Sequence, residues 1–377
     1  MFIWQQRDWP KFRWDAQTLL TPLAEARHRQ GQLLGVMRRL GFDLKREAEL
    51  HAATEEAIKT SAIEGEIFDL ASVRSSVARR LGLPDGGLAP ADSKVEGTVE
   101  MTLDATRNYN APLTAKRLFG WHAALFPTGY SGMHRIRVGG WRTDAAGPMQ
   151  VVSGAIGRAK VHYEAPPATR LPGEMKQFLA WFAESSDLES LLRAGTAHLW
   201  FVTIHPFDDG NGRIARAIAD LALAQMEATG QRFYSMSSQI QRERKTYYDI
   251  LEGTQRGSLD ITSWLMWFTH CFTRAIEHAE KESQEVFRKA EFWQRFAKES
   301  LSERQKTVIN RFLSGFEGVL TAKKWAALAK CSVDTAQRDI NDLVSRGLLV
   351  RNPGGSKRTS YSIPGVRTGS AIAAAAD

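Results

Sequence analysis

The sequence is poor in cysteine and contains no long hydrophobic run. Among its 377 residues are two cysteines, Cys271 and Cys331, which lie far apart and have no neighbouring cluster of histidines. This pattern excludes a disulfide framework and a cysteine-based zinc site, and it predicts reduced thiols in a cytoplasmic protein. No apolar stretch approaches the roughly 18 residues that a membrane-spanning helix requires. The first residues, MFIWQQRDWPKFRWD, are aromatic and charged, which argues against a secretion signal.

The overall composition is that of an ordinary globular protein with a basic charge balance. Hydrophobic residues make up 43% of the chain and charged residues 24%, and the formal net charge is +8. The length favours two or three domains. The positive charge favours anionic ligands such as nucleotides or nucleic acid, but it does not identify one. We find no internal repeat.

Helical periodicity dominates most of the chain. Segment 81–93 is rich in glycine and proline and indicates a loop. Within the glycine-rich stretch 139–167, the sequences PMQVVSG and KVHYEAPP predict a β-hairpin. The fold class is therefore mainly α with one hairpin. Apolar residues recur at three- and four-residue spacing, which predicts helices over 16–40, 43–64, 92–109, 114–126, 173–204, 213–228, 242–255 and 261–290.

The C-terminal part has a different pattern. Residues 301–364 show three short helical patterns, then GLLVR, a glycine-rich turn and TSYSI, which is typical of a winged helix. We expect this domain over 300–364 and a disordered tail over 365–377. Segment 332–347 is the expected recognition helix, with Ser332 or Asp334 near its N-cap.

Polar and basic side chains favour DNA binding by this C-terminal part. A dimerisation or protein-interaction module remains an alternative, because winged helices also serve those roles. The side chains expected to contact bases are Gln337, Arg338 and Asn341, and those expected to contact phosphates are Lys357 and Arg358 in the wing, with Lys323, Lys324 and Lys330 nearby.

The stretch HPFDDGNGRIAR, residues 205–216, is the densest group of chemically active residues. It follows the apolar helical segment 197–205, which ends at His205. Pro206 and the glycines of the Gly-Asn-Gly turn prevent that helix from continuing. A new helix begins near Arg213, so the turn presents backbone N–H groups at a helix N-terminus, where an anion is favoured.

The side chains of this stretch are suited to a nucleotide. Arg213 and Arg216 lie on one helical face and can hold phosphate oxygens. Asp209 offers a hard oxygen ligand for Mg²⁺, and Asn211 adds amide donors. His205 supplies a group of near-neutral pKa suited to a general base. Together these residues predict a base, a magnesium ligand and a phosphate-binding turn.

The stretch resembles the signature of Fic proteins, H-x-F-x-[DE]-G-N-G-[RK]-x-x-R, at every fixed position. The resemblance implies a compact helical core with a β-hairpin flap. It also implies transfer of AMP from ATP to a hydroxyl of a target protein, with release of pyrophosphate. In that reaction His205 would deprotonate a Ser, Thr or Tyr hydroxyl, and Asp209 would hold Mg²⁺ on the α- and β-phosphates.

The same resemblance assigns the nucleotide-binding residues. Phe207 would point into the core and anchor the loop, whereas Asp208 stands at a variable position and receives no role. The anion hole would be formed by Gly210, Asn211 and Gly212, the β- and γ-phosphates would contact Arg213, and the γ-phosphate would contact Arg216.

A second motif, KTSAIEGEIF at 59–68, resembles the inhibitory motif of the same family, [ST]-x-x-x-E-[GN]. The matching residues are Thr60, Glu64 and Gly65. The resemblance implies that Glu64 pairs with Arg216 and holds the ATP phosphates in a non-productive position. The motif precedes the catalytic core, which implies the N-terminally inhibited class. The same carboxylate is also suited to orient a water that removes AMP.

Other segments complete the resemblance. The flap over 139–167 is expected to dock an extended target segment by strand addition. Segment 242–252 resembles the lining of the adenine pocket, where one tyrosine would stack on the base; we favour Tyr248 over Tyr247. We interpret His198, on the same helical face as His205, as a core residue. The flap residues expected to face nucleotide or target are Val151, Val152 and Val161.

The expected organisation follows from these segments. Residues 1–90 would form an N-terminal domain with the inhibitory helix, and they resemble the domain of unassigned function that often precedes Fic cores. We expect its tryptophans to pack on the helical core. Residues 91–290 would form the Fic domain.

Three other functions remain open. The fold also serves for AMP removal, or for transfer of UMP or phosphocholine. A DNA-binding regulator with an ATP-sensing Fic domain is a further alternative, although a sensor needs neither His205 nor Asp209. A reversed, kinase-like nucleotide pose is disfavoured by Arg213. Dimers are common in the family, and the sequence leaves the oligomeric state and the target open.

Overall fold

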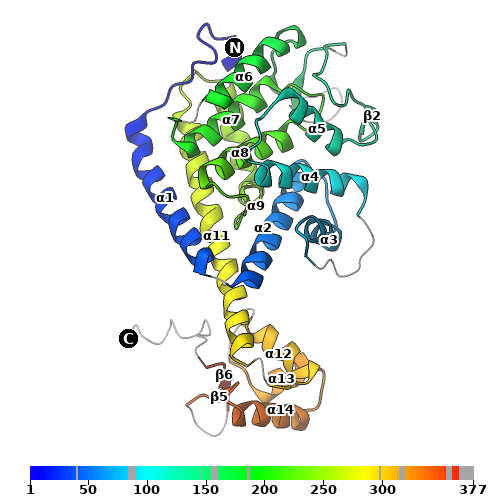
Figure 1. The fold of residues 1–377 in the computed structure, drawn as a ribbon, viewed down its shortest axis with the longest axis vertical. Coiled ribbons are helices and arrows are strands. Elements are labelled where there is room, and N and C mark those ends of the chain that lie inside the picture. The colour runs from blue at the N-terminus through cyan, green and yellow to red at the C-terminus, as the bar shows by residue number, and fades with distance from the viewer. Residues whose placement is uncertain are drawn as a thin grey trace. The chain divides into compact units, whose positions relative to one another are not determined.

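The computed structural model describes residues 1–39, 41–83, 91–145, 147–153, 160–184, 187–296, 299–313, 319–353 and 359–364. It divides the chain into two compact units, Met1–Ala279 and Glu280–Asp377. Figure 1 shows the order of helices and strands along the chain. The expected N-terminal segment, 1–90, and the expected catalytic segment up to residue 279 belong to the first unit.

The first unit is mainly helical, as predicted. Its strands are short and form two separate antiparallel pairs among the described residues. In chain order, the helical elements up to the unit boundary, the last of which extends past it, are η1 (Ile3–Gln5), α1 (Ala16–Arg39), α2 (Phe42–Ile63), α3 (Leu70–Arg80), α4 (Ser93–Arg107), α5 (Ala115–Leu125), η2 (Ala168–Arg170), α6 (Leu171–Glu184), α7 (Ser190–Ile204), α8 (Asn211–Glu227), α9 (Met236–Arg242), α10 (Arg244–Gln255) and α11 (Thr262–Arg295).

Most predicted helices lie where the periodicity placed them, with two differences. The single helix predicted over 173–204 is wrong, because this segment divides into α6 and α7. The Glu189 carboxylate caps α7 by accepting the N–H groups of Leu191 and Leu192 at 2.8 and 2.9 Å. Such a cap satisfies donors that have no partner within the helix. Helices α3 and α9 were not predicted.

Helix α7 lies in the centre of the first unit, packed against α8 (Figure 1). Every residue from Leu191 to Ile204 is buried. The N-terminal segment covers part of this core, because the Trp9 ring meets the Trp200 ring edge-on with centroids 6.3 Å apart. Trp4 Nε1 also donates to the Glu164 carbonyl at 2.7 Å. The expectation that the N-terminal tryptophans pack on the helical core is confirmed for Trp9, whereas Trp4 bonds to β4.

The predicted hairpin is present. Strand β3 (Gln150–Ser153) pairs antiparallel with β4 (Lys160–Glu164), with Val151 opposite Tyr163 and Val152 opposite Val161. This register leaves His162 as an extra residue on β4, which is a β-bulge. A second, smaller pair joins β1 (Tyr130–Ser131) and β2 (His134–Arg135).

After the end of α11, the described part of the second unit contains three helices followed by two short strands, the order that the sequence predicts. They are α12 (Glu303–Leu313), α13 (Ala322–Ala329), α14 (Val333–Ser345), β5 (Val350–Arg351) and β6 (Tyr361–Ser362). A small core formed by residues such as Val308, Trp325 and Ile340 holds them together. The assignment as a winged helix stays a prediction.

The polar residues of this unit are placed as follows. The Ser332 hydroxyl caps α14 by accepting the Thr335 N–H at 3.2 Å, so Ser332 rather than Asp334 is the N-cap. Gln337 donates to Asn341 at 2.9 Å and to the Tyr361 hydroxyl at 3.1 Å, whereas Arg338 is exposed. Lys323, Lys324 and Lys330 are exposed. Lys357, Arg358 and the tail over 365–377 lie outside the described residues.

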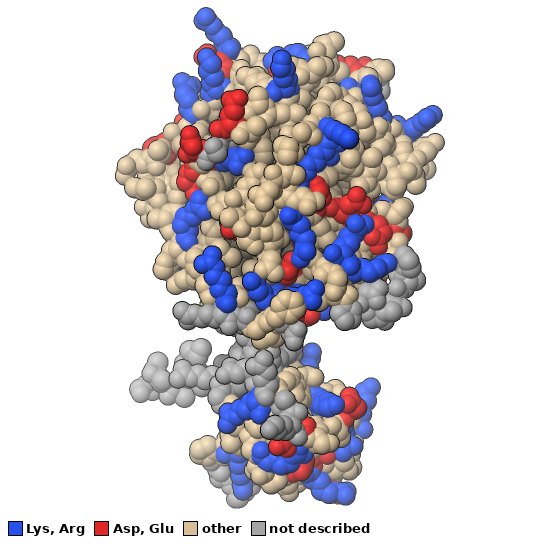
Figure 2. All heavy atoms as spheres, viewed as in Figure 1, with Lys and Arg blue, Asp and Glu red and all other residues tan. Residues whose placement is uncertain are grey.

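The surface charge gives little guidance to function. On the face shown in Figure 2, Lys and Arg side chains are interspersed with Asp and Glu. The buried arginines described below are more informative. In the described part of the chain, no helix is both long enough and apolar enough to cross a membrane.

Candidate active site

The loop between α7 and α8 carries the predicted catalytic motif in an unusual backbone conformation. His205 ends α7 in the left-handed region with φ of 52°, and Gly210 precedes α8 with φ of 81°. A left-handed non-glycine residue is strained by roughly 1–3 kcal/mol and persists only where its surroundings hold it. Here the buried Arg142 holds it, since its Nε donates to the His205 carbonyl at 2.8 Å.

Asn211 closes the loop from the other end. Its Oδ1 accepts the Phe207 N–H at 3.0 Å, and its Nδ2 donates to the Phe207 carbonyl at 2.8 Å. Phe207 is fully buried and stacks on the His122 ring with centroids 4.2 Å apart, which is the anchoring that the resemblance implies. The Asn211 amide therefore braces the loop, and the part of Asn211 best placed for an anion is its backbone N–H at the start of α8.

The His205 imidazole is oriented as a base. Its Nδ1 lies 3.1 Å from the Val202 carbonyl oxygen. Because a carbonyl only accepts, Nδ1 carries the hydrogen, and in the neutral ring Nε2 keeps a free lone pair. Burial lowers the pKa of His205 to about 4, although the Val202 carbonyl favours the charged form. The ring is thus neutral at physiological pH and can accept a proton.

The two acids of the motif have different contacts. Asp209 Oδ1 accepts the Gly210 N–H at 2.6 Å, and Oδ2 accepts the Ser131 hydroxyl. Asp208 accepts the Arg137 N–H at 2.8 Å. No group of three or more potential metal ligands occurs among the described residues. A single carboxylate such as Asp209 nevertheless fits Mg²⁺, which keeps several waters and completes its shell with phosphate oxygens.

Arg216 is held by the predicted inhibitory motif. Its Nε donates to the Thr60 hydroxyl and its Nη2 to the Thr60 carbonyl, both at 2.8 Å. The same Nη2 lies 2.8 Å from Glu64 Oε1. Burial alone would lower the pKa of Arg216, but the Glu64 carboxylate together with Tyr247 and Tyr248 raises it. The structure thus brings Thr60 and Glu64 to Arg216, which lies more than 150 residues further along the chain.

The Glu64 carboxylate also covers the glycine turn. A Cβ atom added at Gly212 would lie 2.2 Å from Glu64 Oε1. Glu64 follows the last residue of α2, and Gly65 then turns the chain with φ of 89°. The space above the expected anion-binding turn is therefore occupied by an anion from the protein itself.

Sequence reasoning missed a second acidic contact. Arg213 Nη1 lies 2.7 Å from Glu66 Oε2, and its guanidinium stands 4.9 Å from the centre of the Phe126 ring. Lys94 lies 3.7 Å from the other oxygen of Glu66. Both expected phosphate-binding arginines are thus paired with carboxylates two residues apart. The sequence feature that could have predicted this contact is the second glutamate of IEGE, because Glu66 lies two residues after Glu64.

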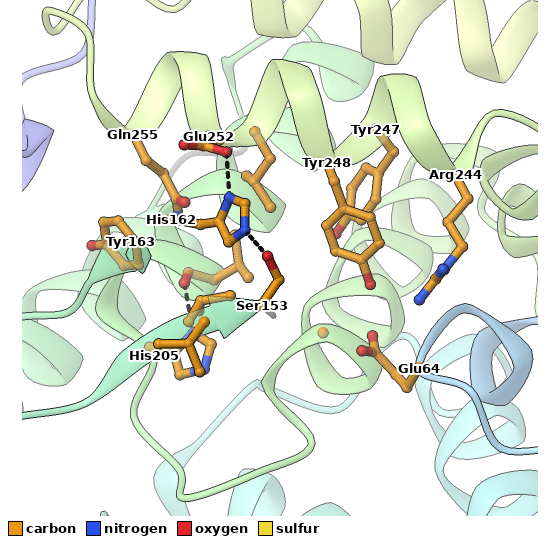
Figure 3. Close-up of a pocket in the computed structure, with 15 residues that line it drawn as sticks. Glu64, Ser153, His162, Tyr163, His205, Arg244, Tyr247, Tyr248, Glu252 and Gln255 are labelled. Carbon is orange, nitrogen blue, oxygen red and sulfur yellow. Dashed lines mark hydrogen bonds and ion pairs between the residues drawn. The ribbon is translucent and has the colours of Figure 1, made fainter. Parts of the chain in front are cut away.

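A cavity of about 490 Å³ adjoins these residues (Figure 3). This volume lies in the range of small-molecule sites. Residues from the flap, α7, α8 and α10 line it together with Glu64, and they include Val151, Val152, His205, Gly212 and Tyr248. Val161 is not among the lining residues; it lies opposite Val152 on β4.

The two adjacent tyrosines differ as helical geometry requires. Tyr247 is 1% exposed, and its hydroxyl lies 3.0 Å from His198 Nε2. Tyr248 is half-buried, and Figure 3 shows it pointing toward Glu64. Its hydroxyl lies 3.4 Å from the Ile63 carbonyl. His198 is almost fully buried, and burial lowers its pKa to about 3, so its placement is that of a core residue.

Three further residues on the cavity wall were not predicted. Ser153 and His162 come from the flap and Glu252 from α10, and they are hydrogen-bonded in series. Arg244, also on the wall, donates to the Ile63 carbonyl at 2.8 Å. No local motif joins these positions, because the His162–Glu252 contact spans 90 residues.

The fold and this loop define a class: a helical domain in which a histidine base and a glycine turn line a nucleotide-sized cavity, with two buried arginines beside the turn. Residues 112–223 match the Fic/DOC family, and residues 2–83 match a domain of unknown function, DUF4172. Residues 112–223 therefore form a Fic/DOC domain, as the signature at 205–216 predicted, and a DUF4172 domain precedes it, as the resemblance of residues 1–90 predicted.

Named relatives resemble part of the chain. It is 30% identical over 247 residues to the Protein adenylyltransferase Fic of Culex quinquefasciatus, which covers 63% of this chain and 43% of the relative. It is 28% identical to Protein adenylyltransferase fic-1 of Caenorhabditis elegans, over 44% of this chain and 30% of the relative. A Uridine 5'-monophosphate transferase of Xanthomonas campestris is 31% identical over 30% of this chain and 21% of the relative. The chain spans less than half the length of these relatives.

Solved structures share the fold. A Fic family protein from Desulfovibrio desulfuricans G20 matches with a TM-score of 0.54 at 18% identity, over 94% of this chain and 98% of that one. Fic-1 of C. elegans matches with a TM-score of 0.50 at 18% identity, over 73% of this chain and 75% of that one.

Proposed function

We propose that the protein is an autoinhibited protein adenylyltransferase of the cytoplasm, which moves AMP from ATP to a hydroxyl of a target protein or of itself. The observation that carries this proposal is the position of His205. A neutral imidazole with a free Nε2 shares one cavity with a glycine turn, and two buried arginines lie beside that turn. The names of the relatives, Protein adenylyltransferase, agree with it.

The chemistry follows from these positions. The N–H groups of the glycine turn and the two arginines would bind the phosphates, and Tyr248 would stack on the base. His205 takes the proton from the target hydroxyl as its oxygen bonds to the α-phosphorus. The bond from the α-phosphorus to the bridging oxygen breaks, and pyrophosphate leaves with the electron pair. Asp209 would hold Mg²⁺, which supplies positive charge to the phosphates.

The proposed inhibition rests on Glu64. Its carboxylate pairs with the Arg216 guanidinium, which is then not available to phosphate. It also lies against Gly212 and fills space that phosphate oxygens need. ATP that binds beside it would have its phosphates displaced from the position required for attack. The Thr60 contacts to Arg216 fix the guanidinium in the paired orientation.

The flap is suited to hold the target. Val151 and Val152 are 37% and 52% exposed, and in the described part β3 pairs with β4 alone. A strand with a free edge can accept an extended segment through main-chain hydrogen bonds. Such docking would present a target hydroxyl to His205 and would depend little on the amino-acid sequence of the target.

Incorporation of label tests the proposal. ATP labelled at the α-phosphate should mark the Glu64→Gly protein far more strongly than the parent, whereas ATP labelled at the γ-phosphate should leave the protein unmarked. The matched control is Glu55→Gln, which removes a carboxylate from the same helix without touching Arg216. His205→Ala should abolish transfer to added target proteins. Equal labelling of parent and Glu64→Gly would refute the inhibitory role.

One rival has a specific observation in its favour. A relative named Uridine 5'-monophosphate transferase matches 30% of the chain, so the nucleotide could be UTP. The cavity wall that would meet the base carries Tyr248 and Leu251, which contact any base without reading its edge. Competition of unlabelled UTP and CTP against labelled ATP separates the two nucleotides. Removal of AMP is tested by incubating a modified target with the parent protein.

A further inference from the structure

The first residues of the chain contact the flap. The Phe2 ring meets the Tyr163 ring edge-on with centroids 5.2 Å apart, a favourable geometry for two aromatic rings. Trp4 Nε1 donates to the Glu164 carbonyl at 2.7 Å. Tyr163 and Glu164 are consecutive residues of β4. Because they contact this strand at two neighbouring positions, we call residues 2–6 the N-terminal brace.

Arg256, at the end of α10, connects the brace to the same strand. Its guanidinium lies 5.3 Å from the centre of the Phe2 ring, within the range of a cation–π interaction. Its Nη2 and Nε donate to the carbonyls of Val161 and His162 at 2.6 and 3.0 Å. Gln6 Nε2 donates at 2.7 Å to the carbonyl of the residue that follows Arg256. The brace and the end of α10 therefore hold β4 jointly.

These contacts leave the two edges of the hairpin unequal. Strand β4 pairs with β3, and side-chain donors from the brace and from Arg256 bond to three of its carbonyls. A further strand beside β4 would have to displace those side chains. In the described part of the chain β3 pairs with β4 alone, and Val151 and Val152 are exposed. The hairpin thus offers the edge of β3, where the proposed docking takes place.

Strand β4 is also bonded to the residues around the catalytic base. The Tyr163 side chain is buried, and its hydroxyl donates at 2.6 Å to the carbonyl of Thr203, two residues before His205. Arg142, which holds the His205 carbonyl, donates from Nη2 at 2.5 Å to the carbonyl of Pro166, just past β4. The Tyr163 ring therefore lies between the brace and the helix that ends at the base.

We propose that the N-terminal brace is a positioning element for AMP transfer: Phe2 and Trp4 hold β4 so that a target docked on β3 presents its hydroxyl to His205. This inference rests on the proposed function, and it gives the first residues of the DUF4172 domain a role in the reaction. The brace is not among the residues that line the cavity. Loosening it should therefore slow the transfer and leave the binding of ATP intact.

Initial rates of AMP incorporation test the inference in the full-length Glu64→Gly protein, with the concentration of α-labelled ATP varied. Adding Trp4→Phe removes one hydrogen bond to the flap and keeps an aromatic ring. We expect the maximal rate to fall about two- to tenfold, which is the worth of a typical net hydrogen bond, and the KM for ATP to stay the same. The matched control is Trp9→Phe, whose lost indole bond of 2.8 Å goes to Glu174 on α6 instead of the flap.

Hydrogen–deuterium exchange measures the flap directly and needs no target protein. Exchange at the amides of β4 should be faster in Trp4→Phe than in the parent, because local opening of the strand becomes easier, and it should be unchanged in Trp9→Phe. Phe2→Ala should act as Trp4→Phe does. Phe2→Tyr keeps the ring, so it should restore both the slow exchange and the maximal rate.

The outcomes separate this inference from the proposed function. An unchanged maximal rate in Trp4→Phe, with or without faster exchange, would overturn the inference and leave the proposed function standing. Equal losses in Trp4→Phe and Trp9→Phe would reveal a general loosening of the N-terminal domain, and a higher KM for ATP at an unchanged maximal rate would reveal an effect on the nucleotide; either result would overturn it as well. Absence of AMP from the Glu64→Gly protein itself would refute the proposed function.

Discussion

Removal of the Glu64 carboxylate should strengthen ATP binding and leave AMP binding unchanged. The carboxylate lies 2.8 Å from Arg216 Nη2 and 2.2 Å from the position that a Cβ atom on Gly212 would take. It therefore competes with the outer phosphates of ATP and not with the nucleoside. A hydrogen bond to a charged group contributes about 1.5–3 kcal/mol. The Glu64 side chain is 32% exposed, so we take the lower end. We therefore expect the ATP dissociation constant of Glu64→Gly to fall about tenfold.

Calorimetric titration measures this difference directly. ATP, ADP and AMP are titrated in turn into the parent, Glu64→Gly and the same-helix control Glu55→Gln. AMP carries none of the phosphates that Arg216 is expected to meet, so its affinity should be the same for all three proteins. An equal gain for AMP and ATP would mean that the substitution opens the cavity in general, and the competition argument would be wrong.

The remaining predictions concern other contacts. Glu66→Gln frees Arg213 from its ion pair, so titration should show tighter ATP binding, and adding it to Glu64→Gly should strengthen binding further; no change would mean that Arg213 does not meet phosphate. Because the pKa of His205 is about 4, the imidazole loses its base function only below that pH, and kcat/KM for target modification should stay flat from pH 8 to 6. A fall centred near pH 6.5 would contradict this. If the second unit binds DNA, a gel shift at low salt should disappear at high salt; absence of binding at low salt removes the DNA hypothesis.

The sequence places the centre of the candidate site in one loop because its residues are consecutive. His205, Asp209 and the glycine turn lie within one loop, and the chain can only present them together. The Glu64–Arg216 pair was also predicted, but only through resemblance to the family, since nothing local relates residues in different helices. The apolar run of α7 predicted a buried helix, and the structure confirms it.

The elements that the sequence missed lacked a local pattern. Helix α3 buries Ser75 and Ser76 beside its valines, so polar residues occupy inward positions and weaken the apolar periodicity. The hydrogen-bonded series of Ser153, His162 and Glu252 joins two strands and a helix, and no spacing in the sequence links them. Glu66 was overlooked because the inhibitory motif ends at Gly65.

The contacts of α2 indicate how the proposed inhibition can be released. Near its middle, Glu56 accepts the Ser235 hydroxyl at 2.7 Å and the N–H of Ser237 at 3.0 Å, and it is 8% exposed. Near its end, in contrast, buried Arg216 Nη1 and Arg213 Nε have no hydrogen-bond partner among the described residues. A buried donor without a partner costs about 1–3 kcal/mol, and phosphate oxygens could satisfy both. The hydrogen-bonding groups around Glu64 are therefore less fully satisfied than those around Glu56 in the same helix. We infer that release moves the turn at Glu64 while the rest of α2 stays packed on α9.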